Sequence, residues 1–257
     1  MINPLYSLAG AFVGVLVGFT GVGGGSLMTP LLILLFGFHP VTAVGTDLLY
    51  ASITKTAGTT VHGISGTIDW KIVRRLATGS VPTTALTLLV LAYAGTRFEG
   101  TEHVITFALG LALIATAIAM AFRRQILARF GHVVDRMTPE RVARLTVVLG
   151  AMLGVLVSLS SVGAGAIGMT VLLILYPKAP INRLVGSDIA HAVPLTLIAG
   201  LGHWAMGAVD FGLLASLLVG SIPGIIIGSM LSSRVPERIL RPILAGTLAI
   251  VGGKLIF

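Results

Sequence analysis

The sequence contains no cysteine, and only 10% of its 257 residues are charged. The lack of cysteine excludes a secreted scaffold held together by disulfides. A soluble domain is about a quarter charged, so this chain has too little charge to cover a surface that faces water. HExxH and GxSxG patterns are missing too, and the histidines are too dispersed for a metal site. We therefore expect no metal, no cofactor and no enzymatic activity.

Hydrophobic residues make up 55% of the chain, and its mean hydropathy is +1.01. A spanning helix needs roughly 20 apolar residues, so the chain has room for about eight to ten helical segments and for no sizeable soluble domain. The net charge of +8 does not indicate a nucleic-acid partner, because the basic residues lie between apolar runs, where cytoplasmic loops collect them. We expect a multi-pass protein whose surroundings are a lipid bilayer.

Apolar segments occur in two groups of five. They lie near 5–20, 26–37, 42–62, 72–95, 102–122, 143–158, 166–176, 183–203, 210–231 and 239–256. The one long polar stretch, Arg123 to Arg144, separates the groups. We therefore expect a first transmembrane repeat over 1–122, a basic cytoplasmic linker over 123–142 and a second transmembrane repeat over 143–257.

The two groups also share sequence. At a shift of 140 residues, Gly14–Val17 falls on Gly154–Val157. At a shift of 141 the matching pairs are Gly45 and Gly186, Asp47 and Asp188, His62 and His203, Asp69 and Asp210, and Pro82 and Pro223. Shared Asp, His and Pro in one register are not expected from apolar composition alone, so the pattern indicates an internal duplication.

The orientation of the second copy follows from the number of crossings. Two short segments flank a glycine-rich stretch in each half, which suits a broken or re-entrant helix pair and gives each half an odd number of crossings. With the linker in the cytoplasm, only Arg97 and Lys254 then fall outside, and Lys55 lies within the membrane. We expect an all-α polytopic membrane protein of two inverted repeats, each a glycine-broken or re-entrant helix pair plus three transmembrane helices, with both termini outside.

The glycine-rich breaks are the first candidate site. Glycine weakens a helix by about 1 kcal/mol relative to alanine, so these stretches predict non-helical backbone with free amides at membrane depth. Paired broken helices that present such amides are typical of anion sites in transporters. The alternative is close helix packing through small residues. The candidate substrate-binding residues here are Gly23, Gly24, Gly25 and Ser26 in the first break, and Ser161, Gly163 and Gly165 in the second.

Lys55 is the second candidate. A cation in mid-helix costs roughly 2.5–3.5 kcal/mol on insertion scales, so something must compensate its charge. Ser52, Lys55 and Thr59 share one helix face, which we expect to line a polar path for substrate. The position equivalent to Lys55 in the second half is Thr196, so the charge occurs once. The alternative is a structural ion pair with one of the aspartates.

The pairs Asp47 with Tyr50 and Asp188 with His191 are equivalent in the repeat. A carboxylate beside a histidine in a low-dielectric setting could carry a coupling proton or take part in gating. These aspartates also follow a glycine near an expected helix start, where they could instead cap free amides. Capping is the interpretation for Asp69 and Asp210.

Several motifs together resemble the sulfite exporter TauE/SafE family, also called the toluene-sulfonate uptake permease family. They are GFTGVGGGS at 18–26 with Pro30, HPVTAVGTD at 39–47, and His62-Gly63 with Gly66 and Asp69. The resemblance covers nearly the whole chain. It implies a carrier in the bacterial inner membrane for sulfur-containing anions such as sulfite or organosulfonates. The second half departs from the pattern at Ala164 and Ala166.

The residues and the resemblance together predict a secondary transporter that works by alternating access on a small anionic substrate. A proton is a candidate coupling ion. A passive anion channel, or a carrier of another organic anion such as a carboxylate, remains an alternative. The substrate, the direction of transport and the oligomeric state stay open.

Overall fold

The computed structural model describes residues 2–20, 25–97, 101–130, 134, 137–231 and 237–256. These residues form helices and no strand. The helices of the first part are α1 (Pro4–Thr20), α2 (Gly25–Phe36), α3 (Pro40–Ile64), α4 (Trp70–Arg97), α5 (Thr101–Ala121) and α6 (Arg123–Phe130). Those of the second part are α7 (Pro139–Ser160), the π-helical turn η2 (Ala164–Gly168), α8 (Met169–Leu175), α9 (Ile181–Ala205), α10 (Phe211–Leu231) and α11 (Glu237–Ile256).

The expected all-α architecture is confirmed. Each of the ten apolar segments falls on a helix, and the boundaries of α3 and α9 lie within two residues of the expected ones. The helix that the sequence did not predict is α6, which occupies the start of the basic linker at an angle of 71° to α5. Arg123, at that bend, is therefore part of the helical body rather than of a loop.

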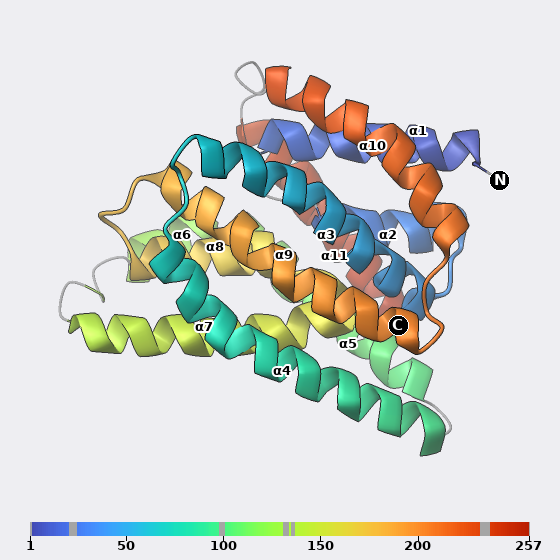
Figure 1. Cartoon of the computed structure of the whole chain (residues 1–257), viewed down its shortest axis with the longest axis horizontal. Helices are drawn as coiled ribbons and strands as arrows, with labels where there is room; N and C mark the ends of the chain where they lie inside the picture. The colour runs from blue at the N-terminus through green and yellow to red at the C-terminus, as the bar shows by residue number, and fades with distance from the viewer. Residues whose placement is uncertain are drawn as a thin grey trace.

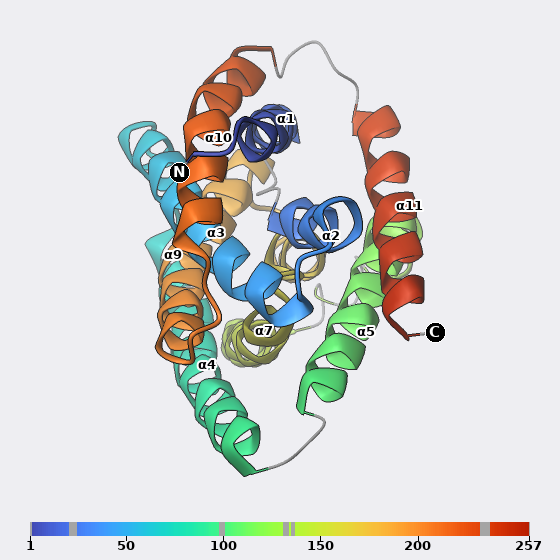
Figure 2. The ribbon, with the colours of Figure 1, turned by 90° about the vertical axis from the view of Figure 1, so that its right-hand side faces the viewer.

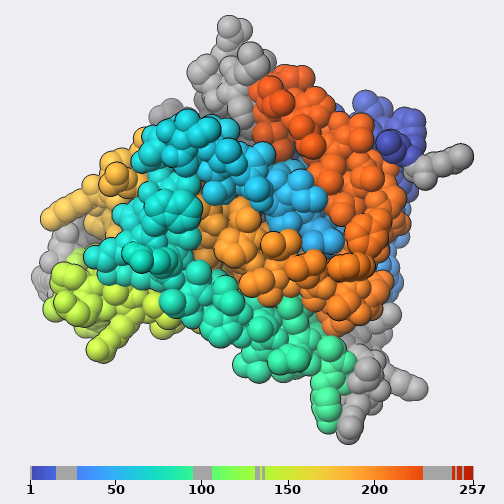
Figure 3. Space-filling view, in the orientation of Figure 1, coloured from blue at the N-terminus to red at the C-terminus, as the bar shows by residue number. Residues whose placement is uncertain are grey.

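Several helices meet the demands of a membrane span by length and apolarity. Among the described residues these are Trp70–Ala94 of α4, the whole of α7 and the whole of α9, with α5 and α6 as a fourth span if the bent pair crosses together. Large apolar side chains remain exposed on the outside, among them Leu89 of α4, Leu201 of α9 and Ile226 of α10. Figure 3 shows the face on which α9 lies between α3 and α4. An exposed apolar surface of this kind suits contact with lipid.

The helices pair across the two halves. α1 packs on α10, α4 on α7, α3 on α9 and α5 on α11. Figure 2 shows α5 and α11 side by side on one flank and α10, α3, α9 and α4 on the other, with α1, α2 and α7 between them. Each pair therefore joins an element of the first half to an element of the second (Figure 1).

Close approach at equivalent glycines produces these pairs. A Cβ added at Gly10 would collide with the carbonyl oxygen of Leu217, and one added at Gly150 would collide with that of Leu76. These are the same contact, because residues 10 and 150 differ by 140 and residues 76 and 217 by 141. Small residues that let backbones approach are the usual means by which helices associate in a membrane.

α3 and α9 also make reciprocal contacts. The backbone of Gly45 packs against Ala208, and that of Gly186 packs against Thr67. Gly45 lies near the start of α3 and Ala208 just beyond the end of α9, so the two helices run antiparallel. The contacts are those expected of two equivalent halves. Their orientation in a membrane stays a prediction.

Two aspartates fix the starts of α4 and α10. Asp69 Oδ1 accepts hydrogen bonds from the amides of Lys71 (2.9 Å) and Ile72 (3.3 Å), and Asp210 Oδ1 accepts one from Leu213 (2.9 Å). The capping interpretation of both residues is therefore confirmed. Their own amides donate to equivalent hydroxyls, that of Asp69 to Ser187 (2.8 Å) and that of Asp210 to Thr46 (3.1 Å).

Candidate functional site

The second glycine-rich break follows α7, and residues 160–166 around it are buried. Ser161 adopts a left-handed conformation with φ 57°, and Gly163 has φ 116°. The carbonyl of Gly163 then accepts hydrogen bonds from the amides of Ile167 (2.9 Å) and Gly168 (3.1 Å), which opens the wide turn η2. The amides at the start of this turn, such as that of Gly165, precede its first hydrogen bonds and find no backbone acceptor among the described residues. The predicted interruption is thus present in this half.

The first glycine-rich break falls largely outside the described residues. Gly23 and Gly24 are not among them. Gly25 is the first residue of α2, and the backbone of Ser26 belongs to the first turn of that helix. The predictions for Gly23 and Gly24 therefore lie outside the described residues.

Asp47 joins three elements of the structure. Its side chain in α3 is fully buried, and its Oδ2 accepts hydrogen bonds from the amide (3.2 Å) and the hydroxyl (2.5 Å) of Thr29 in α2. The hydroxyl of Ser161, in the break after α7, also faces this carboxylate. Asp47 Oδ1 and Ser161 Oγ nevertheless form no hydrogen bond with a described residue. Two buried oxygen atoms that could still form hydrogen bonds therefore lie near the break.

Asp188 occupies the equivalent place in α9 but has different surroundings. It is 3% exposed, and its Oδ1 accepts no hydrogen bond from a described residue. The backbone of Gly168 in η2 lies against it, so that an added Cβ there would be 3.2 Å from Oδ1. The charges of Lys55 and Arg123 both act on this carboxylate. Asp188 is thus held by charge, whereas Asp47 is held by hydrogen bonds.

The alternative in which Asp47 and Asp188 cap helices is wrong. α3 begins at Pro40 and α9 at Ile181, so both aspartates lie in the body of a helix, where the amides are already bonded within the helix. The glycines before them, Gly45 and Gly186, serve close helix contacts instead of a chain turn.

Lys55 lies in α3 on the side that meets α9. It is 8% exposed, and its charge interacts with those of Asp188 and Asp47. Within the described part of the chain it forms neither a hydrogen bond nor an ion pair within 4 Å, so the structure does not show the tight ion pair considered as an alternative. The ammonium group has two buried carboxylates in its neighbourhood and keeps its hydrogen-bond donors.

The two residues that share a helix face with Lys55, Ser52 and Thr59, differ in their hydrogen bonds. Ser52 donates a hydrogen bond to the carbonyl of Leu49 (2.8 Å), while the buried hydroxyl of Thr59 has no partner among the described residues. At the end of the helix, His62 Nδ1 is bonded to the hydroxyl of Thr67 (2.8 Å). These polar side chains therefore extend along α3 from the buried carboxylates toward the C-terminal end of the helix.

His191 is fixed by a residue that the sequence reasoning missed. Its Nε2 shares a hydrogen bond of 2.8 Å with the hydroxyl of Ser80 in α4, and its buried Nδ1 has no partner among the described residues. The equivalent pair in the first half is Tyr50 with Ser221 of α10, which lie side by side. Thr29, Ser80 and Arg123 complete the site, and the repeat register of Ser80 with Ser221 was the one signal that could have pointed to Ser80.

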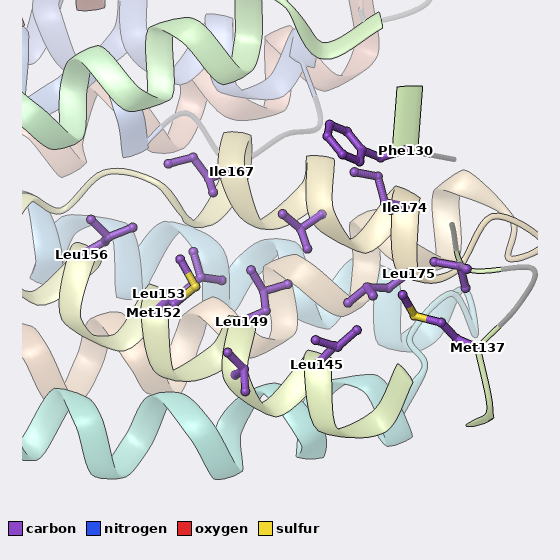
Figure 4. Close-up of a pocket in the computed structure, with 13 residues that line it drawn as sticks. Phe130, Met137, Leu145, Leu149, Met152, Leu153, Leu156, Ile167, Ile174 and Leu175 are labelled. Carbon is purple, nitrogen blue, oxygen red and sulfur yellow. The ribbon is translucent and has the colours of Figure 1, made fainter. Parts of the chain in front are cut away.

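A separate apolar groove lies between α7 and the segment formed by η2 and α8 (Figure 4). Its volume is about 300 Å³, and every side chain that lines it is apolar, including Phe130, Leu145, Met152 and Ile174. A groove without a single polar group offers nothing to an anion. The polar cluster around Asp47, Lys55 and Asp188 is the candidate site, because it gathers buried charged side chains that the groove lacks. Among the described residues, no three His, Asp or Glu side chains gather as a metal site would require.

A bundle of apolar helices around buried charges on interrupted and crossing helices defines a multi-pass membrane transporter. The chain belongs to the sulfite exporter TauE/SafE family, whose sequence model matches residues 6–255. The resemblance read from the motifs is thereby confirmed.

Characterised genomes contain related proteins of similar length. The chain is 41% identical to the probable membrane transporter protein YjnA of Bacillus subtilis, over 97% of this chain and 98% of the relative. It is 30% identical to the probable membrane transporter protein YdhB of the same organism, over 95% and 96%. A probable membrane transporter protein of Methanocaldococcus jannaschii is 24% identical, over 98% and 94%. These names describe transporters and not enzymes. No solved structure shows a significant match.

Proposed function

We propose that this transporter carries a small sulfur-containing anion, such as sulfite or an organosulfonate, across the bacterial inner membrane. The observation that carries the proposal is the state of Lys55, a buried cation whose donors are unused by any described residue. A buried charge is retained only where it has a partner or a function. An anion that enters the bundle would find its counter-charge at this residue.

The remaining contacts to the anion would come from both sides of Lys55. Ser52 and Thr59 lie on the face of α3 that carries Lys55, and the buried hydroxyls of Thr59 and Ser161 have no partner among the described residues. Amides of the break at Gly163 and Gly165 would add donors, since the start of a helix favours negative charge. Gly23 to Ser26 would contribute in the same way from the first half.

The antiparallel contact of α3 with α9 supports alternating access. These two helices are equivalent in the repeat, so the rotation that exchanges them is perpendicular to their length. If both cross the bilayer, that axis lies in the membrane plane, which is the arrangement of inverted repeats. The two halves would then rock about the site, with Pro82 in α4 and Pro223 in α10 as bending points. The linker would face the cytoplasm and both termini the outside.

Counterflow in proteoliposomes tests this function. Vesicles loaded with unlabelled sulfite or methanesulfonate should accumulate the labelled anion, and Lys55→Gln should reduce the initial rate at least tenfold because the anion loses its buried counter-charge. Lys178→Gln is the matched control, since Lys178 is exposed between α8 and α9. Both variants should show the thermal unfolding temperature of the wild-type protein.

Three results would contradict the proposal, each in a different part. Unchanged flux in Lys55→Gln would remove this lysine from the site. Flux that neither saturates nor counter-exchanges would indicate a passive channel that uses the same groups. Counterflow of a carboxylate but of no sulfur-containing anion would retain the transport mechanism and reject the substrate.

A further inference from the structure

The charges around Lys55 leave an incoming anion without compensation. Lys55 contributes one buried positive charge, and Asp47 and Asp188 contribute two buried negative charges when both are ionised. Arg123 also acts on Asp188, but its side chain is only half-buried. The buried groups therefore have no spare positive charge before any substrate arrives, and a monovalent anion added to them is an uncompensated charge inside the membrane, which is costly. Binding therefore requires that one positive charge arrive with the anion.

The two carboxylates differ in their ability to take up a proton. Asp47 Oδ2 accepts hydrogen bonds from both the amide and the hydroxyl of Thr29, and an amide can only donate, so the ionised form is favoured there. Asp188 Oδ1 accepts none from a described residue. Its negative charge depends on Lys55 and Arg123. An anion bound at Lys55 competes with Asp188 for the same cation and thereby favours the protonated form of Asp188.

His191 does not fit the role of proton carrier. A charged imidazole has two N–H donors and needs an acceptor for each. Its Nε2 has Ser80, but its buried Nδ1 faces no acceptor among the described residues, and the positive charge of Lys55 is close. The ring therefore stays neutral and keeps its position through Ser80.

The other ionisable groups near α9 lie elsewhere or are occupied. α9 packs on α3, α4, α7, α8 and η2. Apart from the groups already named, the ionisable and charged residues of these helices whose side chains the structure describes are Tyr50 and His62 in α3, Lys71, Arg74, Arg75 and Tyr93 in α4, and Glu140, Arg141 and Arg144 in α7. His62 is bonded to Thr67 and lies beside Gly186, and Arg75 is bonded to Tyr176. Lys55 and Arg123 are the charges that act on Asp188.

We infer that Asp188 carries the coupling proton of this transporter, and that the anion binds at Lys55 together with one proton on Asp188. The inference depends on the proposed function, because it assigns a role within the same site. It makes transport of a monovalent anion electroneutral. The empty site, with Lys55 and Asp188 both charged, and the loaded site, with the anion and a proton added, then carry the same net charge through the membrane.

The sign of the pH dependence follows directly. The anion binds the protonated form of Asp188, so its affinity is full at low pH and decreases as the pH rises. On the alkaline side the apparent Kd should increase about tenfold per pH unit, because one proton is taken up per anion. Asp188→Asn carries a neutral group in this position at every pH. We expect it to bind the anion with this dependence removed.

The experiment compares binding of labelled methanesulfonate and sulfite to purified protein between pH 5 and 9. The wild-type slope should exceed that of Asp188→Asn by one proton per anion, whichever anion is used, because titration of the anion itself cancels in the comparison. Asp47→Asn is the matched control, and it should keep the wild-type slope. Asp188→Asn should also lose accumulation driven by a pH gradient while it retains counterflow.

Each outcome decides between the two proposals. If Asp188→Asn keeps the wild-type slope, or if the slope disappears in Asp47→Asn, the assignment of Asp188 is wrong while the role of Lys55 stands. If Lys55→Gln binds and transports normally, the proposed function itself is wrong. Proton uptake by the wild-type protein tests the inference even if the variants do not fold. Addition of methanesulfonate to lightly buffered protein should cause uptake of one proton per bound anion, and no uptake would overturn the inference.

Discussion

α3 and α9 occupy equivalent places in the two halves, and they share their packing but not their chemistry. Gly45 and Gly186 make the same backbone contact, and the hydroxyls of Thr46 and Ser187 accept the same hydrogen bond from the opposite half. The side chains that face the interior have diverged. Asp47 is bonded to Thr29, whereas Asp188 faces the charge of Lys55.

The divergence extends to the neighbours of each aspartate. Thr29 donates to Asp47, but its equivalent in the second half, Thr170, donates within its own helix to the carbonyl of Ala166 (2.7 Å). Lys55 has Thr196 as its equivalent, whose hydroxyl likewise donates within its helix, to Ala192 (2.8 Å). A symmetrical frame therefore surrounds a site with its one buried lysine on one side of the axis. In the proposed transport cycle, equivalent helices would move alike while a single substrate binds off the axis.

The largest expected effect concerns the close glycine contacts that pair α1 with α10 and α7 with α4. Gly10→Val and Gly150→Val both place a side chain against the carbonyl of the partner helix, at Leu217 and Leu76. Backbone cannot yield as a side-chain end can, so we expect each to cost about 3 kcal/mol or more. Thermal unfolding in detergent measures the loss. Gly253→Ala is the control, because no atom lies within 4 Å of an added Cβ there. Tolerance of one glycine substitution but not of the other would show that the halves are not mechanically equivalent.

A smaller loss of stability should distinguish the two halves at Thr29 and its equivalent, Thr170. Thr29→Val removes a hydroxyl that donates to a fully buried carboxylate, and hydrogen bonds to charged groups contribute about 1.5–3 kcal/mol. Thr170→Val, at the equivalent position, loses only a bond to its own helix and should cost about 0.5 kcal/mol. The free energies of unfolding in denaturant test the difference. Equal losses would mean that Asp47 is protonated or otherwise satisfied.

The sequence predicted the helices and a duplication for clear physical reasons. For the same reasons it indicated four candidate site residues, Asp47, Lys55, Asp188 and His191. Long apolar runs must be helical in a bilayer, and a buried lysine or aspartate stands out against 55% hydrophobic composition. The same reasoning misplaced the role of the two aspartates. It took Gly45 and Gly186 as signs of a helix start, although these glycines permit close contact within helices that begin at Pro40 and Ile181.

The residues that complete the site could not be found from local patterns. Thr29, Ser80 and Arg123 are ordinary in their own segments, and each acquires its role from a partner in another helix. Thr29 meets Asp47 only because α2 folds back on α3, and Ser80 meets His191 because α4 packs on α9. Contacts of this kind depend on how the helices pack, and no spacing of residues within one sequence indicates them.

The smallest expected effect concerns the N-caps of α4 and α10, which should contribute equally to stability in the two halves. Asp69→Ala and Asp210→Ala each remove an N-cap, from α4 and α10, and a lost cap costs about 1 kcal/mol. The two losses should be equal within error, because each aspartate accepts hydrogen bonds from the first turn of its helix while its own amide is bonded to the opposite half. Asp69→Asn and Asp210→Asn keep a capping oxygen and should recover most of the stability. Since neither residue lies in the proposed anion site, binding of methanesulfonate should keep its wild-type pH dependence in all four variants. A loss confined to one half would show that the duplicated caps, like the duplicated aspartates of the interior, have acquired different roles.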